Sequence, residues 1–190
     1  PAPPRVEQGE AAPVALLGEE APDGLIERGH LAASSRRVLA RNGIGVAVRQ
    51  GPPRPDIATP EAFVRALRAA ASVAYTSEGA SGIYFAGLID RLGIGAEVRA
   101  KARTQPGGLI GELVLAGQAE MAIQQLPELL AVPGIQVVGA LPDALQKINT
   151  TVAGVFARSQ AVEAGSSLVR FLAEPAARAV FRDKGFEPAD

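Results

Sequence analysis

The chain has 190 residues, of which 47% are hydrophobic and 21% are charged, and its formal net charge is −1. A chain of this size can bury a core as one domain or as two small lobes, and its near-neutral charge gives no electrostatic footprint for nucleic acid or a polybasic membrane contact. It has no cysteine, which excludes disulfides, thiolate metal sites and cysteine nucleophiles. Its one histidine, His30, lies in a polar turn, so neither a histidine triad nor a histidine metal site is expected.

The start of the chain carries no visible targeting signal. Residues 1–5 lack a basic region followed by an apolar one, and no apolar run reaches the about 18 residues that span a bilayer. The sequence therefore leaves two alternatives: a cytosolic protein, or a processed or shortened chain.

The first elements have clear local signals. A short apolar strand is predicted at residues 14–17 and a short helix at 21–28. Residues 38–49 alternate like one long strand that bends near Gly43. A helix follows Thr59, which can cap it, because Pro60 suits the first helical position.

The rest of the chain alternates between strand-like and helix-like segments. We predict strands at 72–75, 98–102, 120–124, 135–138 and 150–157, and helices at 83–92, 109–116, 126–130, 161–172 and 175–184. This alternation predicts an α/β fold with a mainly parallel sheet in the middle. The two longest strand-like runs bracket that middle block, which predicts one lobe from residues 1–42 and 153–190 and a second, inserted lobe from residues 43–152.

The loop at residues 75–84, YTSEGASGIY, lies between a predicted strand and a predicted helix. Ligands of open α/β sheets bind beyond the carboxyl ends of the strands, where loops meet helix N-termini. Ser77 and Ser81 offer hydroxyl groups there, and Gly82 allows a close backbone approach. The alternative is an ordinary capped turn, in which Ser81 bonds the N–H of Tyr84.

Two more segments carry polar groups that can line a cleft. Pro106, Gly107 and Gly108 open the helix predicted at 109–116, so that two helix N-termini would converge if both loops lie at one sheet edge. Gln124 and Gln125 end a predicted strand with amides that can donate and accept hydrogen bonds. Tyr84, in the first turn of its helix, can line the same cleft, whereas Tyr75 is expected in the core.

Signals for an enzyme are few. The carboxylates Glu78, Glu112, Glu120 and Glu128 have no telling spacing, and no nucleophile elbow, Walker loop or dinucleotide fingerprint is present. A cleft with donors but no acid–base set predicts binding rather than catalysis, without a metal or a cofactor.

Several segments together resemble the molybdate-type extracellular solute-binding proteins, the periplasmic receptors of ABC importers. They are VEQGEAA at 6–12 leading to VALL, VLARNGIGVAV at 38–48, DIATPEAF at 56–63, SGIYF at 81–85, GQAEMA at 117–122, RFL at 170–172 and GFEP at 185–188. The resemblance covers nearly the whole chain in order. It implies a two-lobed, type II periplasmic binding fold that holds a ligand between its lobes, and a periplasmic or extracellular location.

The family's binding positions carry over in part. They fall on Ser81 and close to Gly107, and a tyrosine that typically contacts the oxyanion falls on Gln125, which departs from a molybdate site. The family also starts with a strand, a helix and a strand that this sequence lacks, so lobe one is expected to be incomplete. A natural deletion, a processed fragment or a swapped homodimer would each explain this.

The sequence therefore predicts a binding protein for a small anionic or polar solute, with an ABC importer membrane subunit as its partner. The predicted ligand contacts are Ser77, Ser81, Gly82, Tyr84, Gly107, Gly108 and Gln125. The alternative is an isomerase or lyase on the same fold that acts on a small organic acid, with Glu78 as base and Tyr84 as acid. A third alternative is an assembly module that has lost binding.

Overall fold

The computed structural model describes residues 8, 12–51 and 54–189, and the predicted irregular start at 1–13 lies largely outside them. The chain forms two compact units. Unit 1 contains Pro1–Asn42 and Asn149–Asp190, and unit 2 contains Gly43–Ile148. Residues 149–152, which the sequence placed with the inserted lobe, lie in strand β8 (Asn149–Val155) and pair with strands of unit 1.

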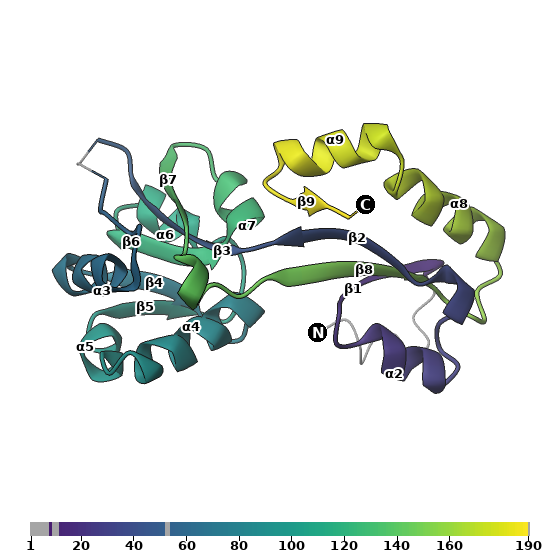
Figure 1. Ribbon diagram of the computed structural model, residues 1–190, viewed down its shortest axis with the longest axis horizontal. Helices are drawn as coiled ribbons and strands as arrows, with labels where there is room; N and C mark the ends of the chain where they lie inside the picture. Colours follow the sequence, from purple (N-terminus) through teal and green to yellow (C-terminus); the bar gives the residue numbers. More distant parts are fainter. Residues whose placement is uncertain (1–7, 9–11, 52–53, 190) are drawn as a thin grey trace. The chain divides into compact units, whose positions relative to one another are not determined.

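Unit 1 is built on a four-stranded antiparallel sheet with the order β1-β8-β2-β9 (Figure 1). Leu17 and Leu25 belong to one buried cluster of this unit, and Leu39 and Val169 belong to a second. Besides β8, its elements are β1 (Val14–Gly18), α2 (Pro22–Glu27), η1 (Ala33–Ser35), β2 (Arg37–Asn42), α8 (Val162–Leu172), α9 (Pro175–Asp183) and β9 (Glu187–Pro188).

Unit 2 is built on a five-stranded sheet with the order β5-β4-β6-β3-β7. Strands β5, β4 and β6 are parallel, and β3 runs antiparallel to both of its neighbours. Its elements are β3 (Ile44–Arg49), α3 (Pro60–Ala69), β4 (Val73–Thr76), α4 (Ala80–Arg91), α5 (Gly95–Arg99), β5 (Ala102–Gln105), α6 (Gly111–Leu115), β6 (Met121–Gln125), α7 (Leu126–Leu130), β7 (Ile135–Ala140) and η2 (Asp143–Leu145).

The helices of unit 2 cover both faces of this sheet. Phe63 of α3, Phe85 of α4 and Val98 of α5 belong to one core cluster. Val114 of α6 and Leu129 of α7 belong to a second cluster, with residues from the other side of the strands. Because both faces of the sheet are buried, polar groups are expected where its parallel strands β5, β4 and β6 end and the following loops begin. We call this end of the sheet its carboxyl edge.

Two local predictions have different outcomes. Thr59 caps α3 as expected, because its Oγ1 accepts a hydrogen bond from the N–H of Ala62 at 3.2 Å. The strand predicted at 98–102 is wrong: Val98 is a buried residue of α5, and the strand β5 begins at Ala102. β5 lies at the sheet edge with polar side chains, so it lacks the apolar alternation that predicts a strand.

Candidate functional site

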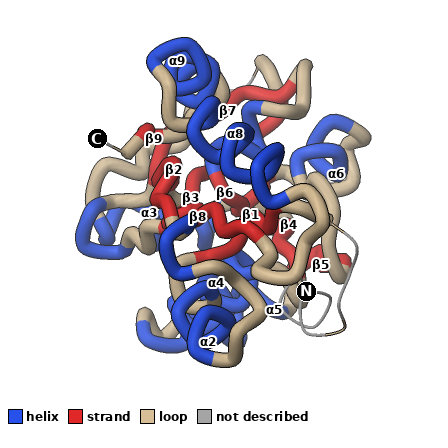
Figure 2. Tube along the Cα trace, turned by 90° about the vertical axis from the view of Figure 1, so that its right-hand side faces the viewer, coloured by secondary structure: helices blue, strands red, loops and turns tan. Residues whose placement is uncertain are grey.

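The loops that follow β4 and β5 lie side by side at one edge of the unit 2 sheet. The two strands are parallel neighbours, so their carboxyl ends meet at this edge. Figure 2 shows β4 and β5 next to each other. The N–H of Ser77 donates to the carbonyl of Gln105 at 2.9 Å, and the N–H of Glu78 donates to the carbonyl of Pro106 at 3.3 Å. The two loops that the sequence singled out are therefore brought together.

The N-terminus of α4 has no side-chain cap. Gly79 is the N-cap residue, and the first bond of the helix runs from the N–H of Ile83 to its carbonyl at 2.9 Å. Within the described part of the chain, no acceptor bonds the N–H groups of Ala80, Ser81 or Gly82. The capped turn expected as the alternative, with Ser81 bonding the N–H of Tyr84, is therefore wrong. Unpaired N–H groups at the first turn of a helix bind anions.

Ser81 and Gly82 serve different purposes in this first turn. Ser81 is only 2% exposed, and its hydroxyl forms no hydrogen bond with any residue in the described ranges. A Cβ on Gly82 would lie 1.7 Å from the carbonyl oxygen of Thr76. Glycine is therefore required for α4 to pack on the end of β4, a reason that is independent of the ligand approach that the sequence suggested.

The loop after β5 is held by two glutamine side chains. Gln105 Nε2 donates to the carbonyl of Gly107 at 2.8 Å, and Gln124 Nε2 donates to that of Gly108 at 2.7 Å. Gln124 Oε1 in turn accepts from the N–H of Ile110 at 2.8 Å. Both glycine carbonyls are thus occupied, while their N–H groups bond no acceptor in the described residues.

The second helix N-terminus expected at this edge belongs to a short helix, α6. α6 begins at Gly111 and has five residues, so the loop before it contributes separate backbone N–H groups rather than the end of a long dipole. Gly108 has a φ of +91°, a conformation that few other residues adopt, and this lets the chain turn between β5 and α6.

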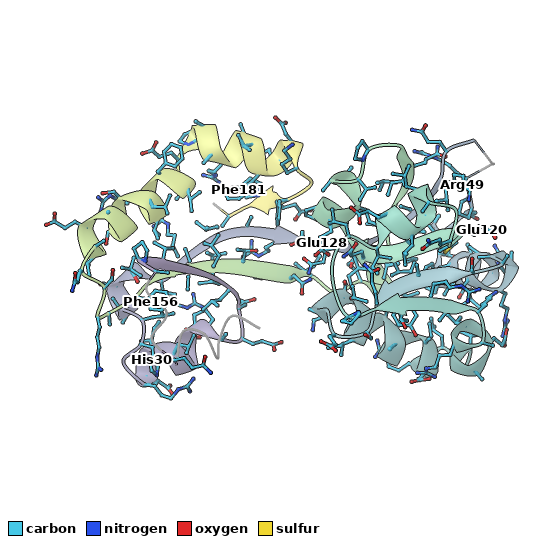
Figure 3. The ribbon with its side chains drawn as sticks, turned by 180° about the vertical axis from the view of Figure 1, so that it is seen from behind. His30, Arg49, Glu120, Glu128, Phe156 and Phe181 are labelled. Atoms are coloured by element: carbon cyan, nitrogen blue, oxygen red, sulfur yellow. The ribbon has the colours of Figure 1, made fainter. Side chains whose placement is uncertain are left out.

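Glu128 also lies at this edge, although from the sequence it was only one of four carboxylates without a telling spacing and not a predicted ligand contact. It lies in the first turn of α7, directly after β6, and is partly buried (Figure 3). Burial raises the pKa of its carboxyl, although the backbone N–H of Gln125 and the side chain of Gln124 offset part of this effect. The signal in the sequence was its place three residues after a helix N-cap, where a glutamate bonds back to the N-cap N–H.

Tyr84 and Glu78, the acid and base of the predicted enzyme, differ in their surroundings. The hydroxyl of Tyr84 donates to the carbonyl of Leu145 at 3.0 Å, and Arg91 and Lys147 lie over its ring at 5.3 and 5.8 Å from the centroid. Tyr84 thus fastens α4 to η2. Glu78 is exposed in the loop before α4, next to exposed Ser77.

The edge therefore combines backbone N–H donors, the unbonded hydroxyls of the buried residues Ser81 and Thr76, and one carboxyl with a raised pKa. This set can bind an anion and can exchange a proton with it. No group of His, Cys, Asp or Glu in the described ranges is arranged to hold a metal ion. Over the same ranges, no helix is long and apolar enough to cross a bilayer.

Comparison with known proteins decides the family. Residues 2–187 match the model of the bacterial extracellular solute-binding proteins. The chain belongs to this family. The predicted resemblance and the predicted α/β binding-protein fold are thereby confirmed.

Individual relatives of this solute-binding protein differ in what they are named for. It is 40% identical to an aconitate isomerase from Pseudomonas sp. over 187 residues. This alignment covers 98% of this chain and 71% of the isomerase. Its fold matches the periplasmic molybdate-binding protein of Azotobacter vinelandii with a TM-score of 0.78 at 14% identity, over 100% of this chain and 84% of that one. It also matches the substrate-binding domain of a molybdenum ABC transporter from Clostridium difficile, with a TM-score of 0.72 at 16% identity, over 100% and 82% of the two chains.

Proposed function

We propose that this solute-binding protein binds a small polycarboxylate, aconitate first among the candidates, at the carboxyl edge of the unit 2 sheet. The observation that carries the proposal is the uncapped first turn of α4, whose free N–H groups lie beside Ser81, a residue that is only 2% exposed and whose hydroxyl forms no hydrogen bond in the described ranges. A ligand carboxylate there would accept the hydrogen bonds that the helix leaves unmade.

The second loop supports a ligand with more than one carboxylate. The N–H groups of Gly107 and Gly108 offer a further donor pair on the neighbouring loop, which is fastened to the first by the bond from Ser77 to Gln105. Separate donor groups suit an extended anion with several carboxylates better than one compact oxyanion. The aconitate isomerase relative favours the same class of ligand. Ser77, Gln125 and Tyr84 stay proposed contacts, with Tyr84 acting through its ring.

Isothermal titration calorimetry tests this binding. The panel is trans-aconitate, cis-aconitate, citrate, molybdate, tungstate and sulfate. We expect saturable heat with the tricarboxylates. Ser81→Ala should weaken tricarboxylate binding by about 1.5–3 kcal/mol, the range for a hydrogen bond to a charged group. Ser34→Ala, an exposed serine of unit 1, is the control and should bind as the parent does. Saturation by molybdate or tungstate alone would instead assign the protein to the oxyanion receptors.

Isomerisation of aconitate is the second candidate function, and the raised pKa of Glu128 favours it alongside the aconitate isomerase relative. Removal of a methylene proton from aconitate leaves a carbanion that is delocalised over the allylic carbons and their carboxylates. Return of a proton to the far carbon of the former double bond gives aconitate again, with the double bond moved. The base and acid of this shift need pKa values near the working pH. We propose Glu128 for one of these roles, since Tyr84 already bonds Leu145, and keep Glu78 for the other.

Proton NMR in D₂O separates the two functions. An isomerase converts trans-aconitate to cis-aconitate and exchanges its methylene protons for deuterium, whereas a binding protein leaves both unchanged. Glu128→Gln and Glu78→Gln should each lower the rate of conversion by at least about tenfold while trans-aconitate still binds. If the parent protein binds trans-aconitate but neither converts it nor exchanges its protons, its function is ligand binding for transport.

We also propose that the protein works outside the cytoplasm and delivers its ligand to the membrane subunit of an ABC importer. This rests on the family and on the periplasmic molybdate-binding protein that shares its fold. Fractionation of the cells that express it should place it in the periplasm or medium. Retention with a cytosolic marker enzyme would contradict this location and the importer partner together.

A further inference from the structure

A cavity lies in unit 2 at the end of the sheet opposite the proposed ligand site. Its volume is about 550 Å³. The cavity opens where β4 and β6 begin and where β3 and α3 end. In Figure 3, Arg49 and Glu120 mark this side of unit 2, and Glu128 lies on the opposite side. The residues around it are Val48, Arg49, Pro55, Ala66, Ala69, Ala70, Ala71, Ser72, Gly117, Ala119, Glu120 and Met121.

Small side chains make this space. Five alanines surround it, four of them on or just after the last turns of α3, where larger side chains would fill the volume. Val48 and Met121 are both at most 5% exposed and give the cavity an apolar floor. A cavity of this volume with apolar walls and a few polar groups has the form of a small-molecule site.

The two charged side chains at the cavity are held in different ways. Glu120 Oε2 accepts the N–H of Ala71 at 2.6 Å, and the N–H of Glu120 donates to Ser72 Oγ at 3.0 Å, which fixes this carboxylate at the start of β6. The side chain of Arg49 forms no hydrogen bond or ion pair with any residue of the described ranges, and only its backbone is paired, in β3. Its guanidinium lies against Gly117, where a Cβ would be 2.5 Å from Nη2.

We propose that this cavity binds a small aliphatic α-amino acid. Its carboxylate would accept hydrogen bonds from Arg49, its ammonium would lie at the remaining oxygen of Glu120, and its side chain would cover the floor of Val48 and Met121. A simple carboxylic acid would meet the carboxylate of Glu120, and a simple amine would meet the cation of Arg49, so only a ligand with both charges satisfies the two. The site is independent of the proposed tricarboxylate site.

Met121 gives this proposal a direct reporter. It is the single methionine of the chain and lies on the cavity floor. In protein labelled with [methyl-¹³C]methionine, L-leucine added to about 10 mM should shift the Met121 methyl resonance with saturation. 4-Methylpentanoate, which lacks the ammonium, and 3-methylbutylamine, which lacks the carboxylate, should each bind at least about tenfold more weakly.

Variants assign the contacts. Arg49→Gln should weaken leucine binding by at least about tenfold, and Ala69→Leu should block it by filling the cavity mouth. Arg182→Gln, on α9 of unit 1, is the matched control and should bind leucine as the parent does. A methyl resonance that leucine does not move overturns the site. Equal binding of leucine and 4-methylpentanoate, or unchanged binding by Arg49→Gln, overturns the assignment of a zwitterionic ligand.

Discussion

Glycine has different purposes at Gly82 and Gly107, although both belong to the loops of the proposed site. Gly82 lies in the first turn of α4, where its Cα faces the carbonyl and hydroxyl of Thr76. Gly107 is exposed in the loop after β5, and no atom lies within 4 Å of the place where its Cβ would be. Gly82 is thus a packing residue and Gly107 is a surface residue.

Gly82→Ala should therefore destabilise the protein, against what helix propensity alone predicts. Alanine in a helix interior gains about 1 kcal/mol over glycine. Here the new Cβ would lie 1.7 Å from a backbone oxygen, and relief of that overlap requires α4 to shift on β4. We expect the free energy of unfolding in urea to fall by at least about 2 kcal/mol. Gly107→Ala is the control and should stay within about 0.5 kcal/mol of the parent.

The identity of such residues was predictable in part. Ser81 and the loop amides could be placed at a helix start from the small residues around them, and the structure agrees. The packing of Gly82 against Thr76 could not be predicted, because it depends on a distance between α4 and β4 that no local pattern fixes. The role of Tyr84 also depends on a distant partner, the carbonyl of Leu145, 61 residues further along the chain.

At the scale of elements, a buried glutamine of β6 helps to set the shape of the loop between β5 and α6. Gln124, 1% exposed on β6, bonds both the carbonyl of Gly108 and the N–H of Ile110. Beyond the end of β5 the backbone no longer pairs with a neighbouring strand, and the side chain of Gln124 bonds it instead. These bonds hold the N–H groups of Gly107 and Gly108 in fixed positions.

Gln124→Leu should loosen this loop. Ile110 is fully buried, so its N–H would lose its acceptor without gaining water, at a cost of about 1–3 kcal/mol in stability. Tricarboxylate affinity should fall as well, because ordering the loop would then oppose binding. Urea denaturation and calorimetry measure the two effects. Gln118→Leu, an exposed glutamine, is the control, and equal stability of the two variants would contradict the role of Gln124.

Elements with strong local signals were predicted, and those without them were not. The bend near Gly43 separates β2 from β3 as expected, and a Cβ there would lie 2.8 Å from Gln146 Nε2. The helix α5 was missed because the short apolar run around Val98 is compatible with either a strand or a helix. Its helical form places Val98, which is fully buried, in the same core cluster as Phe85, and Arg99 pairs with Asp90 of α4 at 2.6 Å.

At the scale of the whole molecule, the charged groups give stability two opposite dependences on pH. Hydrogen bonds from Arg99 and Arg68 lower the pKa values of the exposed carboxyls of Asp90 and Glu97, respectively. Each carboxylate therefore contributes its full stabilisation at pH values above its usual pKa. That stabilisation is lost as the pH falls through the lowered pKa of the folded state. Burial raises the pKa of Glu128. Its folded form binds a proton that its unfolded form has released, so stability falls as pH rises from the usual glutamate pKa to the raised one.

Glu128→Gln should remove the second dependence and leave the first. Glutamine resembles the protonated carboxyl, so the variant should gain stability over the parent above the raised pKa of Glu128, and the difference should shrink as pH falls to the usual pKa of about 4.3. Urea denaturation over a pH series measures this difference, with hydrogen exchange of α7 and β6 amides to locate it in unit 2. Glu97→Gln serves as a control of opposite sign, because it should lose stability relative to the parent at neutral pH and recover it in acid. A stability difference for Glu128→Gln that does not change with pH would show that the carboxyl acts only by capping α7.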